Sequence, residues 1–283
     1  MRVYISADIE GITGLVSWSQ CGRPKSQYYD YGFAREMMTH DVNAAIRGAL
    51  QAGATEVVVK DSHGNSKNLL IGDLEPGTQL ISGHGSAAID GVADGMMMGI
   101  DSTFDAAILV GYHAMAGTSR GIMEHTITGG VHRLWINGRL TGEMGLSAGV
   151  AGHYGVPLAA VSSDQAGCEE IAALIPGISS ATVKFGYGRF MGRLLHPSET
   201  GPLIENAVFF GLTSIPAPVR FSEPVTLRVE FNRAEEADQI LKLAPVHRID
   251  AYTVEGTFAT YPEAHQVCWL LMSLSGTGID AQD

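Results

Sequence analysis

The first half of the chain repeats one pattern: a short apolar run ends in polar residues, and a helical pattern follows. Such runs occupy Val3 to Ala7, Val57 to Val59, Ala106 to Val110 and Leu158 to Val161. Near-continuous apolar strands that alternate with helices are typical of a parallel sheet covered on both faces. We therefore expect an α/β fold with three layers, in which a mostly parallel sheet lies between helices, plus a smaller α+β part.

Two local patterns add to this expectation. Apolar residues recur at helical spacing across Phe33 to Ala52, which predicts a long helix. Later, Asn137-Gly138 separates two short β-like segments, which is a strong signal of a β-hairpin. Glu143 is expected to close this hairpin, and a helix of small residues is expected over Met144 to His153.

The pattern changes after about residue 190. Apolar and polar residues alternate from Val225 to Phe231, as they do in a half-buried antiparallel strand. A helix over Ala234 to Leu243, a strand over Ala251 to Phe258 and a helix over Pro262 to Leu274 are expected to follow. We therefore predict a larger α/β domain over residues 1–190 and a smaller α+β region over residues 191–283.

Charge and cysteine usage exclude several classes of protein. The 283-residue chain has a formal net charge of −12, whereas nucleic-acid binding requires clustered Lys and Arg. The three cysteines, Cys21, Cys168 and Cys268, lie far apart with no C-x-x-C spacing, as in a reduced cytoplasmic protein. No secretory signal is expected at the N-terminus, and every apolar run is shorter than the roughly 18 residues of a membrane helix. We expect a cytoplasmic protein without nucleic-acid or membrane partners.

Residues of the types that bind metals stand just after three of the expected strands. Asp8 and Glu10 follow the first strand, Asp61 and His63 the second, and His113 the third. In open parallel sheets, sites form beyond the carboxyl ends of the strands, so these side chains are expected to lie close together. Asp8 and Glu10 are two residues apart, so an extended segment points both carboxylates to one side, where a cation would remove their repulsion. Imidazole and carboxylate ligands suit zinc, and also manganese, iron or cobalt.

Each of these features also has an ordinary structural explanation. A D-x-E sequence after a strand is commonly a turn or a helix cap, and a single His113 fits a hydrogen-bonded core histidine. Asp61 is expected to orient the turn before His63 rather than to bind metal. Two further candidates are Asp164, at another strand end, and His84, which is expected to belong to a surface turn. The coincidence at successive strand ends is what favours a divalent-metal site.

Several ordered motifs resemble one known family. Ser6-Ala7-Asp8-Ile9-Glu10-Gly11 resembles the S-x-D-x-E-G signature of the DppA-type D-aminopeptidases, a family of dinuclear zinc peptidases. The similarity covers most of residues 1–190 and continues more weakly beyond. The further blocks follow in the family's order: Asp61-Ser62-His63, Leu80-Ile81-Ser82-Gly83, Gly111-Tyr112-His113-Ala114, Met123-Glu124-His125, Asn137 with Gly142-Glu143-x-Gly145-Leu146, and Val183-Lys184.

The resemblance implies two zinc ions per subunit. The five ligands that it implies are Asp8, Glu10, His63, His113 and Glu143. In this scheme Asp8 bridges the two ions, while Glu10 with His63 completes one site and His113 with Glu143 completes the other. The family also implies a ring-shaped homodecamer with its active sites facing an inner channel, and a two-part α/β architecture.

The resemblance also implies one catalytic histidine, which falls on His125. The family proposal makes this residue a nucleophile. Proton transfer to the leaving amine and stabilisation of the developing oxyanion are the alternatives that chemistry favours, because activation of water by metal makes a second nucleophile unnecessary. All three roles stay open for His125 on the sequence alone.

The expected activity is that of a metal-dependent aminopeptidase acting on small peptides or amides, with a preference for D-amino acids that rests on the resemblance alone. One alternative is a dinuclear metal hydrolase of another class, such as a phosphoester hydrolase. Such sites usually have a Gly-rich cradle or clustered Arg and Lys, and neither stands near the candidate ligands. The other alternative is a non-catalytic peptide-binding protein of a transport system.

Overall fold

The larger of two sheets forms the centre of the molecule. The computed structural model describes residues 1–22, 30–83, 95–242 and 244–275. Within them, seven strands form a sheet that is parallel except for its last pair, β8 and β9. In sheet order these strands are β3 (Gln79–Ile81), β2 (Glu56–Asp61), β1 (Arg2–Ala7), β4 (Ala106–Val110), β7 (Leu158–Asp164), β8 (Ser179–Gly188) and β9 (Met191–Leu194).

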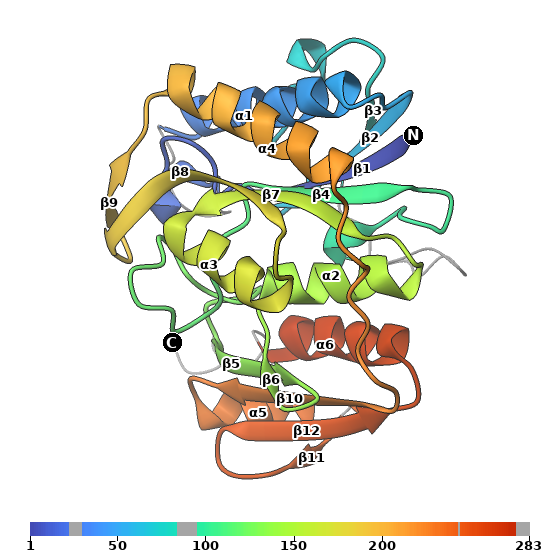
Figure 1. The fold of residues 1–283 in the computed structure, drawn as a ribbon. Coiled ribbons are helices and arrows are strands. Elements are labelled where there is room, and N and C mark those ends of the chain that lie inside the picture. Colours follow the sequence, from blue (N-terminus) through green and yellow to red (C-terminus); the bar gives the residue numbers. More distant parts are fainter. Residues whose placement is uncertain (23–29, 84–94, 243, 276–283) are drawn as a thin grey trace.

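Helices cover both faces of this sheet. α1 (Tyr31–Gln51) and α4 (Pro197–Thr213) pack together on one face, and α2 (Glu143–His153) and α3 (Gln165–Leu174) lie on the other (Figure 1). Within β1, Val3 and Ile5 join the apolar cluster beneath α1 and α4, whereas Tyr4 joins the cluster beneath α2. Burial on both faces explains why the strand is apolar at nearly every position, and the predicted three-layer α/β class is confirmed.

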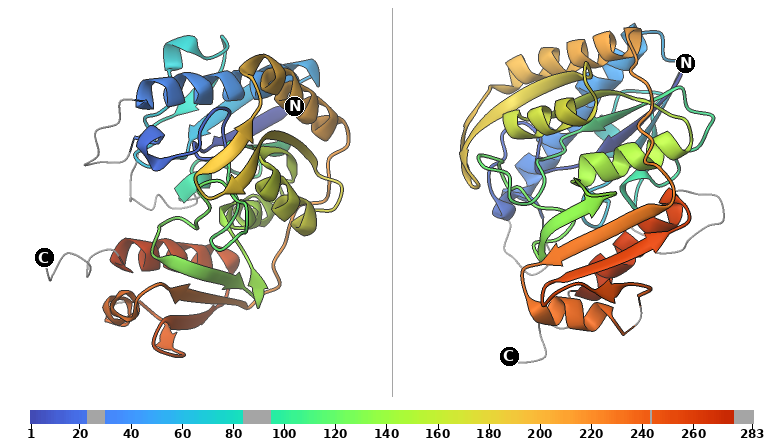
Figure 2. Two further views of the ribbon diagram at one scale, coloured as in Figure 1. Left: turned by 90° about the vertical axis from the view of Figure 1, so that its left-hand side faces the viewer. Right: turned by 60° about the horizontal axis from the view of Figure 1, so that its bottom comes forward.

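A second, antiparallel sheet of five strands lies below α2 (Figure 1). α6 (Tyr261–Ser275) packs between this sheet and α2, and α5 (Ala234–Ile240) packs against α6 (Figure 2). In sheet order the strands are β11 (His247–Arg248), β12 (Thr253–Phe258), β10 (Val225–Phe231), β5 (Val131–Ile136) and β6 (Arg139–Leu140). This sheet with α5 and α6 forms the expected smaller α+β part.

Most of the expected elements are confirmed, with small changes at their ends. Asn137 and Gly138 turn the β5–β6 hairpin with left-handed φ values of 52° and 77°, which are the conformations that this type of turn requires. Glu143 is the first residue of α2 rather than the end of the hairpin. α5 ends at Ile240, so the helix expected to reach Leu243 is shorter than predicted, and Leu243 itself lies outside the described residues.

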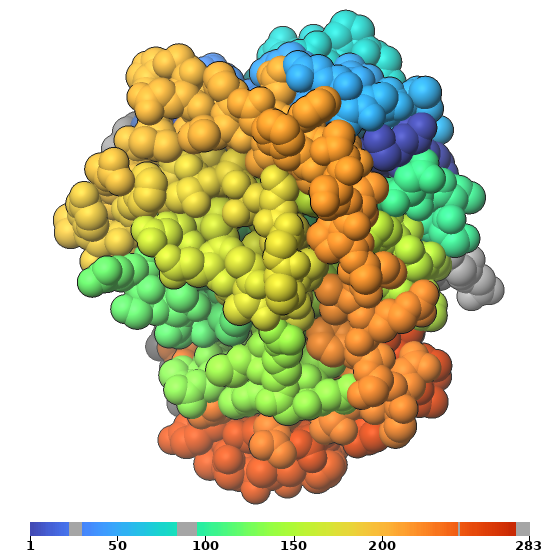
Figure 3. Space-filling model, in the orientation of Figure 1, coloured from blue at the N-terminus to red at the C-terminus, as the bar shows by residue number. Residues whose placement is uncertain are grey.

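Each of the two sheets is built with segments from before and after residue 190. β9 follows that residue but belongs to the larger sheet, and α4 also follows it but packs on that sheet. β5 and β6 precede residue 190 but belong to the smaller sheet. After α4 the chain runs along the outside of the molecule, past Pro216-Ala217-Pro218, to reach β10 (Figure 3). The division into folding units at residue 190 stays a prediction, and sheet membership does not follow it.

Membrane helices and disulfides are two further features that the sequence analysis considered. None of the helices in the described residues is long and apolar enough to cross a membrane. All three cysteines are buried and none forms a disulfide. The cytoplasmic location stays a prediction.

Candidate metal centre

The carboxyl ends of three neighbouring strands bring the predicted ligands together. Ala7 of β1 lies beside Asp61 of β2 and Val110 of β4, so these strands end at the same level. Asp8 and Glu10 follow β1, His63 follows β2 and His113 follows β4. Two more groups complete the cluster: Glu143 at the start of α2 and His125 from the loop before β5.

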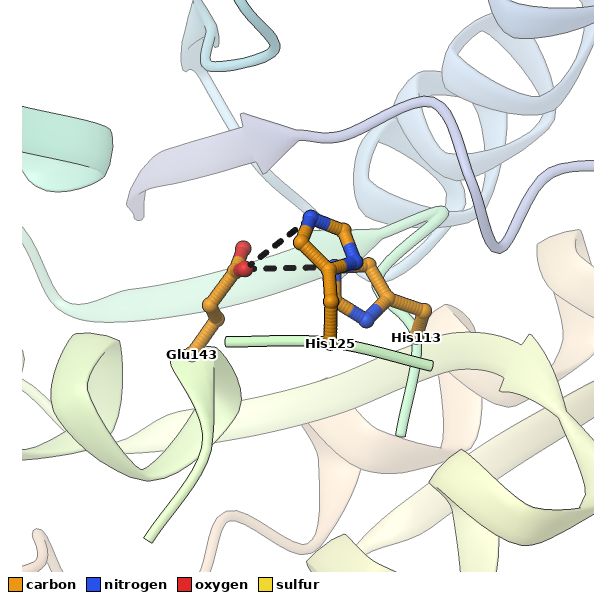
Figure 4. Close-up of side chains that lie close together, drawn as sticks. All are labelled: His113, His125 and Glu143. Carbon is orange, nitrogen blue, oxygen red and sulfur yellow. Dashed lines mark ion pairs between the residues drawn. The ribbon is translucent and has the colours of Figure 1, made fainter. Parts of the chain in front are cut away.

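All six predicted site residues meet in one cluster, and all of them except His63, which is partly exposed, are buried. His63 Nε2 lies 3.3 Å from Glu10 Oε1, and His113 Nε2 lies 3.5 Å from Asp8 Oδ2. Glu143 Oε1 lies 3.3 Å from His113 Nε2 and 3.7 Å from His125 Nε2 (Figure 4). The rings of His113 and His125 stack with centroids 4.0 Å apart. Asp8 and His125 are only 2% and 5% exposed, so the cluster is screened from bulk water.

Hydrogen bonds fix the same tautomer in all three histidines. A carbonyl oxygen can only accept, so the Nδ1–H groups of His113 and His125 donate to the carbonyls of Ala114 and Met123, at 2.9 and 3.0 Å. His63 Nδ1 lies 3.4 Å from the side-chain oxygen of Asn68. In each case Nε2 is left to face the carboxylates, and in the neutral imidazole its lone pair has the orientation that a metal-binding histidine needs.

Three ligand atoms in the cluster have no hydrogen-bond partner among the described residues. They are Asp8 Oδ2, Glu10 Oε2 and His113 Nε2, and all three are buried. An unsatisfied buried polar group costs about 1–3 kcal/mol, and more when it is charged, so native proteins keep few of them. Two groups of ligand atoms lie close enough together to hold an ion: Asp8, Glu10 and His113, and His113, His125 and Glu143. The donor set and its unpartnered atoms fit divalent metal.

The pKa values show how strongly the carboxylates require positive charge. Burial raises the pKa of Asp8 well above its ordinary value, and the charges of Glu10 and Glu143 raise it further. Burial lowers the pKa of His63, but the Glu10 and Asp8 carboxylates outweigh burial and raise it to about 9. Burial is likewise outweighed at His113, whose pKa lies well above its ordinary value because of Glu143 and Asp8. In the metal-free protein, protons on these imidazoles therefore supply part of the charge that cations would bring.

Close packing holds the loop after β1. A Cβ atom on Gly11 would lie 1.8 Å from the Tyr112 carbonyl oxygen, so only glycine fits at the end of the S-x-D-x-E-G motif. The Gly11 N–H donates to the Gly111 carbonyl at 2.7 Å. From the other side, Lys184 donates to the carbonyls of Glu10 and Leu15 at 2.5 and 2.8 Å, with its side chain fully buried. This loop is thereby tied to β4 and to β8 at once.

Asp61 and Asp164 have structural roles. Asp61 accepts from the backbone N–H groups of Asn68 and Leu69 and from the Asn68 side chain, so it orients the loop that carries His63, as expected. The suggestion that Asp164 lines the site is wrong, because its carboxylate caps α3 and accepts from the Ile122 N–H at 2.7 Å. His84 lies outside the described residues.

A cavity of about 590 Å³ opens onto the cluster. This volume is typical of a site for a small molecule. Asp8, Glu10, His63, His125 and Glu143 line it together with Met96 and Met98. Trp269 and Ser273 of α6 complete one wall, so the smaller part of the molecule contributes to the site.

Sequence reasoning missed the residues that support the cluster. Trp18 packs edge-on against the His125 ring with centroids 5.0 Å apart, and Asn68 links Asp61 to His63. Neither has a local signal in the sequence, since Trp18 begins a 3-10 helix of only three residues and Asn68 lies in a loop. Lys184 carried a signal in the Val183-Lys184 block, but spacing alone does not reveal that its ammonium reaches back to the loop after β1.

Comparisons with known proteins agree with this geometry. The family model described as D-aminopeptidase matches residues 1–270. A D-aminopeptidase of Bacillus subtilis (strain 168) is 38% identical over 212 residues, which cover 75% of this chain and 74% of that protein. A solved structure, described as "Zn-dependent D-aminopeptidase DppA from Bacillus subtilis, a self-compartmentalizing protease", matches with a TM-score of 0.90 at 33% identity and covers 98% of both chains. Since the family match runs from the first strand into the last helix and takes in the whole cluster, the chain belongs to the D-aminopeptidase family.

Proposed function

We propose that this chain is a zinc-dependent aminopeptidase that removes the N-terminal residue of small peptides or amides, with a preference for D-amino acids. The observation that carries the proposal is the set of three buried ligand atoms without a hydrogen-bond partner among the described residues, Asp8 Oδ2, Glu10 Oε2 and His113 Nε2, in a cluster that lines a substrate-sized cavity. The Zn-dependence and D-specificity named for the Bacillus subtilis relative supply the metal and the stereochemistry.

The ligand scheme uses two zinc ions per chain. Glu10 and His63 would hold one ion, His113 and Glu143 would hold the other, and Asp8 would contribute to both. The 3.3 Å approach of His63 to Glu10 and the 3.3 Å approach of His113 to Glu143 support this pairing. Zinc bound in this way polarises a carbonyl and lowers the pKa of water towards about 7.

His125 is the residue that would move a proton. Burial, with the positive charge of His113 next in size, lowers the pKa of His125 to about 4, so its imidazole is neutral at pH 7. Its Nδ1–H is committed to the Met123 carbonyl, which leaves the Nε2 lone pair facing Glu143 and the cavity. A neutral imidazole in this tautomer can accept a proton at Nε2 and return it to a leaving amine. The same atom could instead attack a carbonyl, and that is the competing role.

A homodecameric ring is proposed for the assembly. The Bacillus subtilis relative is described as self-compartmentalizing, which requires many copies around an enclosed space. In this chain the β8–β9 hairpin carries exposed apolar side chains that a monomer would leave in water: Tyr187, Phe190, Met191 and Leu194. Clustered exposed apolar residues mark interaction surfaces, so we assign the hairpin to contacts between subunits.

The decisive assay compares matched D- and L-aminoacyl amides and dipeptides. We expect hydrolysis of D-alaninamide by zinc-loaded enzyme, loss of that activity after chelation, and its return when zinc is added back. The L-enantiomer should be cleaved much more slowly. Equal rates for both enantiomers would contradict the stereochemical part of the proposal, and full activity in metal-free enzyme would contradict the metal part.

A further inference from the structure

A buried lysine lines the same cavity. Lys60, on β2, is 2% exposed, yet it contributes to the cavity wall. Its ammonium donates to the Asp61 carbonyl at 2.5 Å and to the Ser66 hydroxyl at 3.0 Å. An ammonium has three N–H donors, and contacts with the described residues account for two of them.

The Lys60 charge has no anionic partner in the described part of the chain. The next residue in the chain, Asp61, has both carboxylate oxygens engaged by Asn68 and Leu69 rather than by the ammonium. Across the sheet Lys60 lies beside Ser6 of β1 and Ile81 of β3, neither of which is acidic. Burial lowers the pKa of Lys60, with Asp61 opposing this. A neutral donor would tie the loop equally well, whereas a buried cation is costly unless an anion meets it.

The cavity therefore has two kinds of polar wall. The carboxylates of Asp8, Glu10 and Glu143, with His63 and His125, form the first. Lys60, the only Lys or Arg among the described lining residues, forms the second. A dipeptide is a zwitterion whose two charges lie about 7 Å apart at most. Its amino group suits the carboxylates, and its carboxylate suits an ammonium with a free N–H.

We propose that Lys60 is a specificity residue that binds the free C-terminal carboxylate of a dipeptide, so that this enzyme prefers dipeptides to substrates without that charge. The inference rests on the aminopeptidase function proposed above and names the substrate class for the same cavity. A charge-assisted hydrogen bond of this kind is among the stronger single contacts in a binding site.

The test compares two substrates that differ only in this charge, D-alanylglycine and D-alanylglycinamide. The measured quantity is kcat/KM for D-alanylglycine divided by kcat/KM for D-alanylglycinamide, from initial rates with the zinc-loaded enzyme. We expect wild type to favour the free dipeptide, and Lys60→Met to lower the ratio about 10- to 100-fold, because it removes the charge but keeps the side-chain length. Lys60→Gln, which retains an N–H donor for Ser66, should lower the ratio in the same way.

Lys67→Met is the matched control, since Lys67 is exposed on the same loop and its ammonium makes no hydrogen bond or ion pair with the described residues. It should keep the wild-type ratio. A wild-type ratio of one or less would overturn the inference even if no Lys60 variant folds, and so would a Lys60→Met ratio equal to that of wild type. Failure of wild type to cleave either substrate with zinc present would instead overturn the proposed function, and this inference with it.

Discussion

His125 differs from the other site histidines in its charge. Its pKa is lowered to about 4, whereas that of His63 is raised to about 9. His63 faces Glu10 at 3.3 Å, while His125 stacks on His113 and meets Glu143 only at 3.7 Å. At neutral pH His125 is therefore an uncharged base with its lone pair on Nε2. His63 and His113 are instead protonated, and metal binding would remove their Nε2 protons.

The His125→Ala variant tests this difference. We expect kcat to fall about 10²- to 10⁴-fold, the usual contribution of a proton-transfer group, while zinc binding is retained because His125 is not one of the five proposed ligands. Kinetics and elemental analysis of the same sample measure both effects. Loss of zinc from this variant would show that His125 is a ligand. A covalent acyl adduct trapped in wild type would favour the nucleophile role over proton transfer.

At the scale of single residues, the sequence predicts the metal ligands better than it predicts the residues that hold those ligands in place. Asp8, Glu10, His63 and His113 could be inferred because each follows a strand of recognisable apolar pattern, and parallel strands end at one edge. Glu143 and His125 could not, since they come from a helix start and an irregular loop, and only the family resemblance supplied them. Lys184 holds the Glu10 carbonyl from a strand 174 residues away in sequence, a contact that no local pattern encodes.

The β8–β9 hairpin and α4 show why some elements escaped prediction. β9 is four residues long and largely exposed, so it lacks the apolar run that marks the central strands. α4 contains Pro202, and both Gly201 and Gly211 lie in the same helix, so its sequence carries the usual signals of a break. These glycines lie against neighbouring groups: a Cβ on Gly211 would sit 2.2 Å from the Ala159 carbonyl oxygen. Packing against the sheet therefore overrides the local signals.

A single charged substitution tests whether the β8–β9 hairpin contacts other subunits in the proposed ring. Met191 on β9 is 61% exposed, and Met191→Asp should break the ring into smaller species because it places a charge on an apolar contact surface. Lys242→Asp, at an exposed position two residues after the end of α5, introduces the same group outside the hairpin and should leave the assembly intact. Sedimentation velocity measures the mass of each. A monomeric wild type, or a Met191→Asp variant that sediments like wild type, would contradict the assignment.

At the scale of the whole molecule, the cavity joins the two sheets. Its floor comes from the strand ends of the larger sheet, one wall comes from α6, and β5 follows the loop that carries His125. The sequence predicted both parts, because their apolar periodicities differ. It did not predict that β5 and β6 belong with strands 90 residues later in the chain, because pairing partners of a hairpin are set by tertiary packing.

The central claim is a two-zinc site bridged by Asp8, and the most direct measurement is the zinc content per chain after gel filtration in metal-defined buffer. Wild type should carry two zinc ions. Asp8→Ala should carry almost none, because the bridge serves both ions, and Glu10→Ala should chiefly weaken one of them. A wild type that binds no zinc, or an Asp8→Ala variant that still binds two, would contradict the account.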